Sequence, residues 1–514
     1  MIAKFIDNNF FTCLGDIDFF VLYLAIAPLF LISYFFGRQE RDTGDFFLGS
    51  RKVPAIVACL SFIATEVSAL TIVAVPATAY SENWEYVQFF FGSAAARIVV
   101  AFLFIPVFYK YNCTSIYEYL KHRFGSETQY TGSIFFFLTR LTASGVRLYA
   151  TCMAVAYIIG WNLSQAIIFF TIISIIFIAF GGIKAVVWAG AYQAIIFFGA
   201  GLALAIYLVM QVHGGLSTAW EIAENANRLS FFNFTFKLND ATTFWAGTAN
   251  AFFVGLAVFG TDQELMQRLL TVDTRKKSQN TIIATIFGAF PVLCLYLAIG
   301  TLLFVFYQQN PEVAKPIEDK EVLAHFITNS LPMGLRGLLL GAIILASIDS
   351  PLSSLSCSFV TDIYRPLIKK AASEKHYLFV SRVGVICFGI ILGLIAFACR
   401  SVENILWFAF KIISVTGGAT LGIFLLGLLT KPAGGKDSSI IAMFQNWANV
   451  VAMIFSAAAM TALLLLSNYE MINLAWSWII VIGTFTTFYM AVYIEFVAWC
   501  LYKLIYRPIK PPKA

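Results

Sequence analysis

The chain has 514 residues, of which 60% are hydrophobic and 12% are charged, with a formal net charge of +6 at pH 7. This composition excludes a soluble domain and indicates a polytopic helical membrane protein. The basic excess is therefore no sign of nucleic-acid binding. Nine cysteines without CxxC pairs and four histidines without paired spacing indicate neither a disulfide framework nor a metal centre. The N-terminus lacks a small-residue cleavage site, so no cleavable signal peptide is expected.

Thirteen apolar spans are predicted in chain order. They cover about residues 18–37, 54–79, 86–109, 129–159, 164–181, 184–210, 243–270, 281–306, 336–360, 378–399, 403–429, 438–466 and 472–502. Of the 34 Lys and Arg residues, 22 lie in one alternate set of loops and seven in the other. The positive-inside rule then places the N-terminus outside and the C-terminus in the cytoplasm, as an odd number of spans requires. We expect a protein integral to the plasma (inner) membrane.

Polar residues interrupt the second and the seventh span. The second contains Glu66 within residues 64–71, and the seventh is interrupted at Gly260–Glu264. The two interruptions lie five spans apart, and such pairs are typical of inverted-repeat transporters, whose broken helices bind ions and solutes. The alternative is that each interruption is a packing kink.

The fourth span carries Arg140, Ser144 and Arg147 on one helical face. An arginine within the membrane requires a protein partner or an anionic ligand. Two interpretations of Arg147 stay open, namely contact with the solute and an internal ion pair with Glu66. Just before this span, residues 114–125 predict a short amphipathic cytoplasmic helix that Gly125 ends.

The ninth span is apolar enough to cross a bilayer but contains Asp349, Pro351 and six serines within residues 341–361. An ionised aspartate at the bilayer centre costs about 2.5–3.5 kcal/mol even on insertion scales, so it is retained where it meets an ion, a partner or a cavity. We favour a cation site over simple packing. On an ideal helix, however, Ser347 and Asp349 point about 160° apart, with Ser350 between them.

Several motifs along the chain resemble those of the sodium:solute symporter family. They are Asp45-Phe-Phe-Leu-Gly-Ser-Arg51, Ala64-Thr-Glu-Val-Ser-Ala-Leu-Thr71, Tyr117-Glu-Tyr-Leu120, Gly181-Gly-Ile183, Thr261-Asp-Gln263, Leu352-Ser-Ser-Leu-Ser356 leading into Asp362-Ile-Tyr364, and Gly422-Ile-Phe-Leu-Leu-Gly427. Each is weak alone, but together they occur in family order over most of the chain.

The resemblance implies an all-α fold of the leucine-transporter type, with two inverted five-helix repeats. The expected divisions are residues 1–53 (first helix and loop), 54–210 (first repeat), 243–429 (second repeat) and 430–514 (two C-terminal helices and tail). It also implies a sodium site between the second and ninth spans, formed by carbonyls of Ala64, Val67 and Ile343 and the side chain of Ser347.

Two departures from the family pattern concern sodium. The hydroxyl residue that usually precedes Ser347 is Ala346 here. In addition, members that resemble sialic acid carriers with two sodium sites have an aspartate where this chain has Gly190. We hypothesise that Asp349, with Ser350, supplies the negative charge that Gly190 does not, since a carboxylate is a natural hard ligand for sodium.

The family's substrate contacts fall on the two interrupted spans and on the fourth span. In this chain they nominate Glu66, Ser68, Thr71, Tyr86, Arg147 and Gln263. The solute is expected to be small and organic, with carboxylate-bearing, sugar-like and sialic-acid-like molecules as candidates.

The expected function is sodium-coupled uptake of that solute by alternating access, with the lipid bilayer as the other partner, no nucleic acid and a monomeric state. The alternatives are a proton-coupled symporter, in which Glu66 and Asp349 titrate, and a solute sensor that retains the transporter fold. The chain shows no nucleophile–base set or metal cluster, so an enzyme is not expected.

Overall fold

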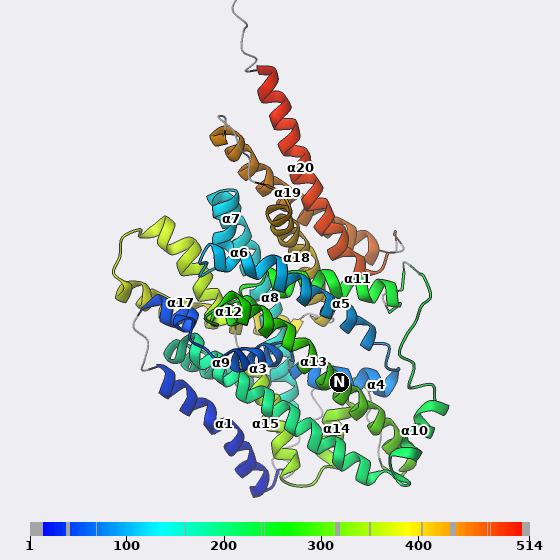
Figure 1. Cartoon of the computed structure of the whole chain (residues 1–514). Helices are drawn as coiled ribbons and strands as arrows, with labels where there is room; N and C mark the ends of the chain where they lie inside the picture. The colour runs from blue at the N-terminus through cyan, green and yellow to red at the C-terminus, as the bar shows by residue number, and fades with distance from the viewer. Residues whose placement is uncertain are drawn as a thin grey trace, which may run out of the picture.

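The computed structural model describes residues 14–37, 42–67, 69–159, 161–237, 239–240, 242–313, 319–348, 351–401, 405–431, 438–469, 471–472 and 474–505. These residues form helices and turns without a strand (Figure 1). The expected all-α class is therefore confirmed.

The longer helices make up the bundle. They are α1 (Asp16–Gly37), α3 (Ala55–Glu66), α4 (Ala69–Ser81), α5 (Val87–Val99), α8 (Ser126–Ile159), α9 (Leu163–Gln211), α11 (Phe244–Gly255), α13 (Arg275–Gln309), α15 (Leu335–Ile348), α17 (Glu374–Ala398), α18 (Ile405–Leu429), α19 (Ser438–Asn468) and α20 (Ile479–Ile505).

Shorter elements connect or extend these helices. They are α2 (Thr43–Leu48), α6 (Ile105–Lys110), α7 (Tyr117–Arg123), α10 (Gly215–Asn225), α12 (Gln263–Leu270), α14 (Val322–Asn329), α16 (Leu352–Ser358) and the π-helical segments η4 (Val100–Phe104), η5 (Leu256–Gly260) and η7 (Phe359–Ile368).

Seven helices of the described chain are long and apolar enough to cross a membrane, or up to nine if each sharply bent pair is one span. The number thirteen stays a prediction. In Figure 1, α7 and the C-terminal end of α20 lie at one end of the molecule, whereas α10 and α14 lie at the opposite end. The loop charges assign α7 and the end of α20 to the cytoplasmic side and α10 and α14 to the outside. Each of these two pairs lies at its own end of the bundle.

Both predicted interruptions are real breaks. Helix α3 ends at Glu66, where Val67 leaves helical geometry with φ −81° and ψ 89°, and α4 begins at Ala69. Helix α11 continues through η5 to Gly260, and α12 begins at Gln263 at an angle of 58° to it. The polar residues in these apolar runs mark the places where the helices stop.

The structure joins the fifth and sixth predicted spans in one element, α9. Gly182 has φ 51° and ψ −162°, so the chain turns there between two helical halves. A glycine suits this position because a positive φ strains other residues. The amphipathic helix expected within residues 114–125 is confirmed as α7.

The ninth predicted span contains two described helices. Helix α15 ends at Ile348, and α16 begins after Pro351 and runs into η7. Asp349 and Ser350 lie outside the described residues.

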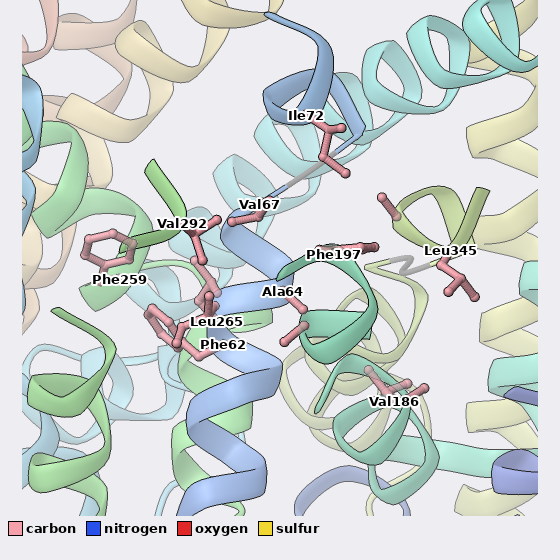
Figure 2. Close-up of a cluster of buried hydrophobic side chains, with 14 of the residues drawn as sticks. Phe62, Ala64, Val67, Ile72, Val186, Phe197, Phe259, Leu265, Val292 and Leu345 are labelled. Atoms are coloured by element: carbon pink, nitrogen blue, oxygen red, sulfur yellow. The ribbon is translucent and has the colours of Figure 1, made fainter. Parts of the chain in front are cut away.

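The apolar core surrounds the breaks. Phe62 on α3 and Phe259 on η5 have ring centroids 5.5 Å apart, and Leu265 on α12 belongs to the same cluster (Figure 2). Side chains from α9 and α15, among them Val186 and Leu345, complete it (Figure 2). This packing fixes both broken helices against one scaffold and so determines where their polar groups lie.

Candidate solute cavity between the broken helices

A central cavity of about 270 Å³ lies where the breaks meet α7, α8 and α18. Apolar side chains make up part of its wall. Its polar lining consists of Thr65, Glu66, Tyr117, Thr139, Arg140, Ser144, Arg147, Thr261, Asp262, Glu264 and Thr420. A cavity that combines an apolar wall with convergent polar groups is the usual form of a small-molecule site.

One wall of the cavity is a cluster of charges around Glu264, whose side chain is 2% exposed. The Glu264 carboxylate lies 2.8 Å from Arg140, 3.8 Å from Arg147 and 4.0 Å from Arg268. Asp262, at the break itself, pairs with Arg140 as well. Three guanidinium groups therefore lie around two carboxylates among the described residues.

Arg147 is the member of this cluster best placed to meet a solute. It lines the cavity, and its side chain is 20% exposed, against 13% for Arg140 and 2% for Arg268. The Glu264 carboxylate that it approaches is closer to Arg140. An anionic group from a solute can therefore bind Arg147 while Glu264 keeps its other arginines.

Glu66 does not pair with Arg147, which was one of the two interpretations left open. Its carboxylate pairs with Arg97 of α5, whose side chain is fully buried, donates to Ser93 Oγ at 2.7 Å and lies 4.5 Å from the centre of the Phe259 ring. Arg147 lies beside Glu264 instead. Arg97 was not singled out from the sequence. An arginine within an apolar span is the signal that could have found it, but spacing along one helix cannot show which carboxylate it meets.

The structure brings only some of the nominated substrate residues to the cavity, namely Glu66 and Arg147. Gln263 is buried elsewhere, where its Nε2 donates to the Thr114 carbonyl at 3.0 Å and its Oε1 accepts from the Ile116 N–H at 2.9 Å. Those two bonds fix the second break to the segment that precedes α7.

The remaining nominated substrate residues lie away from the lining or cannot be placed. Tyr86 stands before α5, 42% exposed, with its ring stacked on Phe89. Thr71 lies on α4, and neither residue lines the cavity. Ser68 lies outside the described residues.

The residues nominated for sodium lie at two helix ends. Ala64 and Val67 are at the end of α3, while Ile343 and Ser347 are in the last turns of α15. Carbonyl groups in the last turn of a helix lack a partner within that helix and can bind a cation; Ala64 lies in the last turn of α3, whereas Ile343 lies farther back in α15. Gln193 of α9 donates to the Leu345 carbonyl at 2.9 Å and so ties α15 to the scaffold beside this region.

Gly190 is glycine for a steric reason. A Cβ at this position would lie 2.4 Å from Ser61 Oγ and 3.1 Å from Ser61 Cα, because α9 and α3 approach each other closely. Arg268 also donates to Ser61 Oγ, at 3.2 Å. An aspartate at position 190 would therefore displace α3 and stand beside a buried arginine that already has its own contacts.

A model of the sodium:solute symporter family matches residues 46–436. The sodium/sialic acid symporter SiaT of Proteus mirabilis (strain HI4320) is 30% identical over 442 residues, which cover 83% of this chain and 87% of the relative. Sodium-coupled monocarboxylate transporter 1 of Xenopus laevis is 28% identical, with coverage of 84% and 70%. A solved structure of a Na+-coupled sialic acid symporter, in a substrate-bound outward-open state, matches with a TM-score of 0.83 and 27% identity over 94% of this chain and 98% of that one.

The broken helices and the polar cavity between them define an integral membrane transporter. This chain belongs to the sodium:solute symporter family. It is a secondary transporter that couples sodium movement to the uptake of a small solute, and sodium is its coupling ion. The family and the relatives are transporters rather than enzymes.

Proposed function

We propose that the solute carries a carboxylate and that Arg147 binds it. The observation that carries this proposal is the exposure of Arg147 to the cavity, within the cluster of arginines around Glu264. Inside a membrane a guanidinium binds a carboxylate strongly, because little water competes for either group. The relatives support the same class, since their names specify sialic acid and monocarboxylates.

The Glu66–Arg97 pair gives the cavity a second polar region. Glu66 is 29% exposed toward the cavity while Arg97 is fully buried, so the carboxylate keeps acceptor capacity for a solute. A hydroxyl or ammonium group is the natural donor to it. A solute with a carboxylate at one end and a hydroxyl or amine at the other fits these two regions.

Sodium binding at the ends of α3 and α15 is the second part of the proposal. Carbonyls of Ala64, Val67 and Ile343 and the Ser347 hydroxyl supply the first ligands. Asp349, with Ser350 beside it in the sequence, supplies the negative charge that position 190 cannot hold. With the N-terminus outside and the C-terminus in the cytoplasm, one sodium ion that moves inward gains about 2.3 kcal/mol per 100 mV. The protein works in the plasma (inner) membrane as a monomer.

The test is thermal melting of the purified protein in sodium or potassium buffer, with carboxylic acids and their neutral amides as ligands. A ligand that binds the folded state raises the Tm by mass action. We expect a rise that is specific to sodium and that the acids, but not the amides, increase. Arg147→Gln should abolish the effect of the acids and retain the effect of sodium, whereas Asp349→Asn should weaken the effect of sodium. Equal stabilisation by acids and amides would contradict carboxylate recognition.

A further inference from the structure

An extended segment rich in phenylalanine connects α10 to α11. Its residues 230–237, here called the Phe strap, form no helix or turn. In Figure 1 the chain between these two helices runs along the edge of the molecule. The Phe strap contains four phenylalanines and no acidic residue. So many large apolar side chains in a connecting segment call for a partner other than water.

Contacts with the starts of two helices fix one side of the Phe strap. The ring of Phe231 lies 5.4 Å from that of Trp84, just before α5. The Asn233 N–H donates to Gln88 Oε1 in the first turn of α5 at 2.9 Å. The Asn233 carbonyl accepts from the N–H of Phe244, the first residue of α11, at 2.7 Å. The strap therefore holds a defined position across the starts of α5 and α11.

The other side of the Phe strap is exposed. In an extended chain alternate side chains lie on one face. The alternate residues Phe232, Phe234 and Phe236 are 43%, 62% and 70% exposed. The rings of Phe232 and Phe234 stack with their centroids 5.6 Å apart. These phenylalanines form an apolar row on the side away from the anchoring contacts.

This row continues onto the surfaces of α5 and α11. The ring of Phe232 lies 5.9 Å from that of Phe91 on α5, which is 46% exposed. In the first turn of α11, Trp245 is 49% exposed, and its Nε1 donates to the Phe234 carbonyl at 3.3 Å. Both helices belong to candidate membrane spans of the described chain. Exposed apolar side chains on such spans face lipid, so the row is continuous with the lipid-facing surface.

The backbone of the Phe strap restricts how deep it can lie in a bilayer. Irregular backbone exposed to lipid does not occur in the hydrocarbon region, because its N–H and C=O groups would lose their hydrogen bonds to water. The interfacial layer supplies water to the backbone and acyl chains to the rings, and aromatic residues are enriched there. Lys237 ends the strap and is exposed. Its long side chain can place the ammonium group at the lipid phosphates.

We propose that the Phe strap lies in the interfacial layer of the bilayer, on the side of the membrane where α11 begins. The three exposed phenylalanine rings insert among the acyl chains, and Lys237 lies at the phosphate groups. The strap thereby anchors to the membrane the start of α11, the helix that leads to the second break.

The test measures the surroundings of a spin label on the strap. The purified full chain in phosphatidylcholine nanodiscs, with one copy in each disc, carries a nitroxide at Phe234→Cys or at Phe236→Cys. The labelled unsubstituted chain supplies the background from the native cysteines. Power saturation compares oxygen, which concentrates in lipid, with a water-soluble nickel chelate. We expect oxygen to relax the label more strongly than the nickel chelate at both positions.

Glu221→Cys is the matched control, because Glu221 is an exposed charged residue on neighbouring α10. The nickel chelate should have the larger effect there. If it also has the larger effect at positions 234 and 236, the strap lies in water and the inference fails. If neither reagent reaches the two labels, protein covers the strap and the inference fails as well. Should Phe234→Cys not fold, position 236 decides alone, since Phe236 is 70% exposed and outside the core.

Discussion

The guanidinium of Arg140 and the carboxylate of Glu264 lie 2.8 Å apart and join α8 to the second half of the broken seventh span. Arg140 also pairs with Asp262, at the break itself. The side chains of these three residues are at most 13% exposed. One arginine therefore contacts two buried carboxylates at the point where the helix direction changes, and it fixes the wall of the cavity on which Arg147 stands.

Arg140→Gln should be among the most damaging substitutions in the cavity wall. It leaves the Asp262 and Glu264 carboxylates with less positive charge in a low-dielectric site, and the loss of one partner of a buried pair costs about 3–5 kcal/mol. Thermal melting in detergent measures the loss. Arg147→Gln is the matched comparison, with a smaller loss because Arg147 is farther from Glu264. Equal losses for the two variants would contradict this assignment of roles.

The Glu66–Arg97 pair predicts that a second substitution restores part of the stability that the first one removes. Glu66→Gln leaves Arg97 charged, fully buried and without its carboxylate. We expect a loss of about 3 kcal/mol, at the lower limit for a buried pair because Glu66 is partly exposed. In the double variant Glu66→Gln, Arg97→Leu, no unpaired charge remains, so part of the stability should return. Additive losses in this double-mutant cycle would mean that the two side chains do not interact.

Gly190→Ala tests the close approach of α9 and α3. The added Cβ would meet Ser61 Oγ at 2.4 Å, and overpacking of this kind costs about 1–3 kcal/mol. Ser61→Gly in the same chain should restore part of the Tm, because it removes the Oγ contact but not the contact with the Cα of residue 61. Gly199→Ala, on the same helix, is the control, since a Cβ there meets nothing within 4 Å and should not lower the Tm. If Gly190→Ala behaves like Gly199→Ala, steric exclusion is not the reason for glycine at position 190.

Asp362 predicts a pH dependence of stability. It lies just beyond the predicted ninth span, where it accepts hydrogen bonds from Ser115, Gln129, Ser133 and Ser358. Burial raises the pKa of its carboxyl from 3.8 to about 7. The folded protein therefore binds this proton more tightly than the unfolded chain does. The contribution of Asp362 to stability is greatest below about pH 4, falls as the pH rises to about 7 and is constant above that.

Asp362→Asn removes the titrating group and should flatten the dependence of the Tm on pH between about 4 and 7. The comparison is the difference between the two proteins at each pH, because other acids titrate in the same range. Glu118, beside Asp362, has its own pKa raised by burial and is unchanged in both proteins. Parallel curves for the two proteins would show that Asp362 titrates normally.

Local sequence predicted the breaks because helix ends are a local property. Polar residues at Glu66 and Asp262 interrupt apolar runs, and the structure ends helices at both places. The same reasoning left the role of Arg147 open and did not identify Arg97 as the partner of Glu66. The distance between Glu66 and Arg97 depends on how α3 packs against α5, and no periodicity within one helix contains that information. Helix α10 was missed for a related reason, since it lies in a segment expected to be a loop.

The sequence by itself determined that this protein spans a membrane, that two of its helices are broken and to which family it belongs. Composition, polar interruptions and ordered motifs are all properties of the chain taken one segment at a time. The tertiary structure decided which charges meet. It placed Arg97 with Glu66, placed Arg140, Arg147 and Arg268 around Glu264, and moved Gln263 away from the cavity. Ion pairs between helices depend on interhelical packing at the ångström scale, which residue spacing along the chain does not specify.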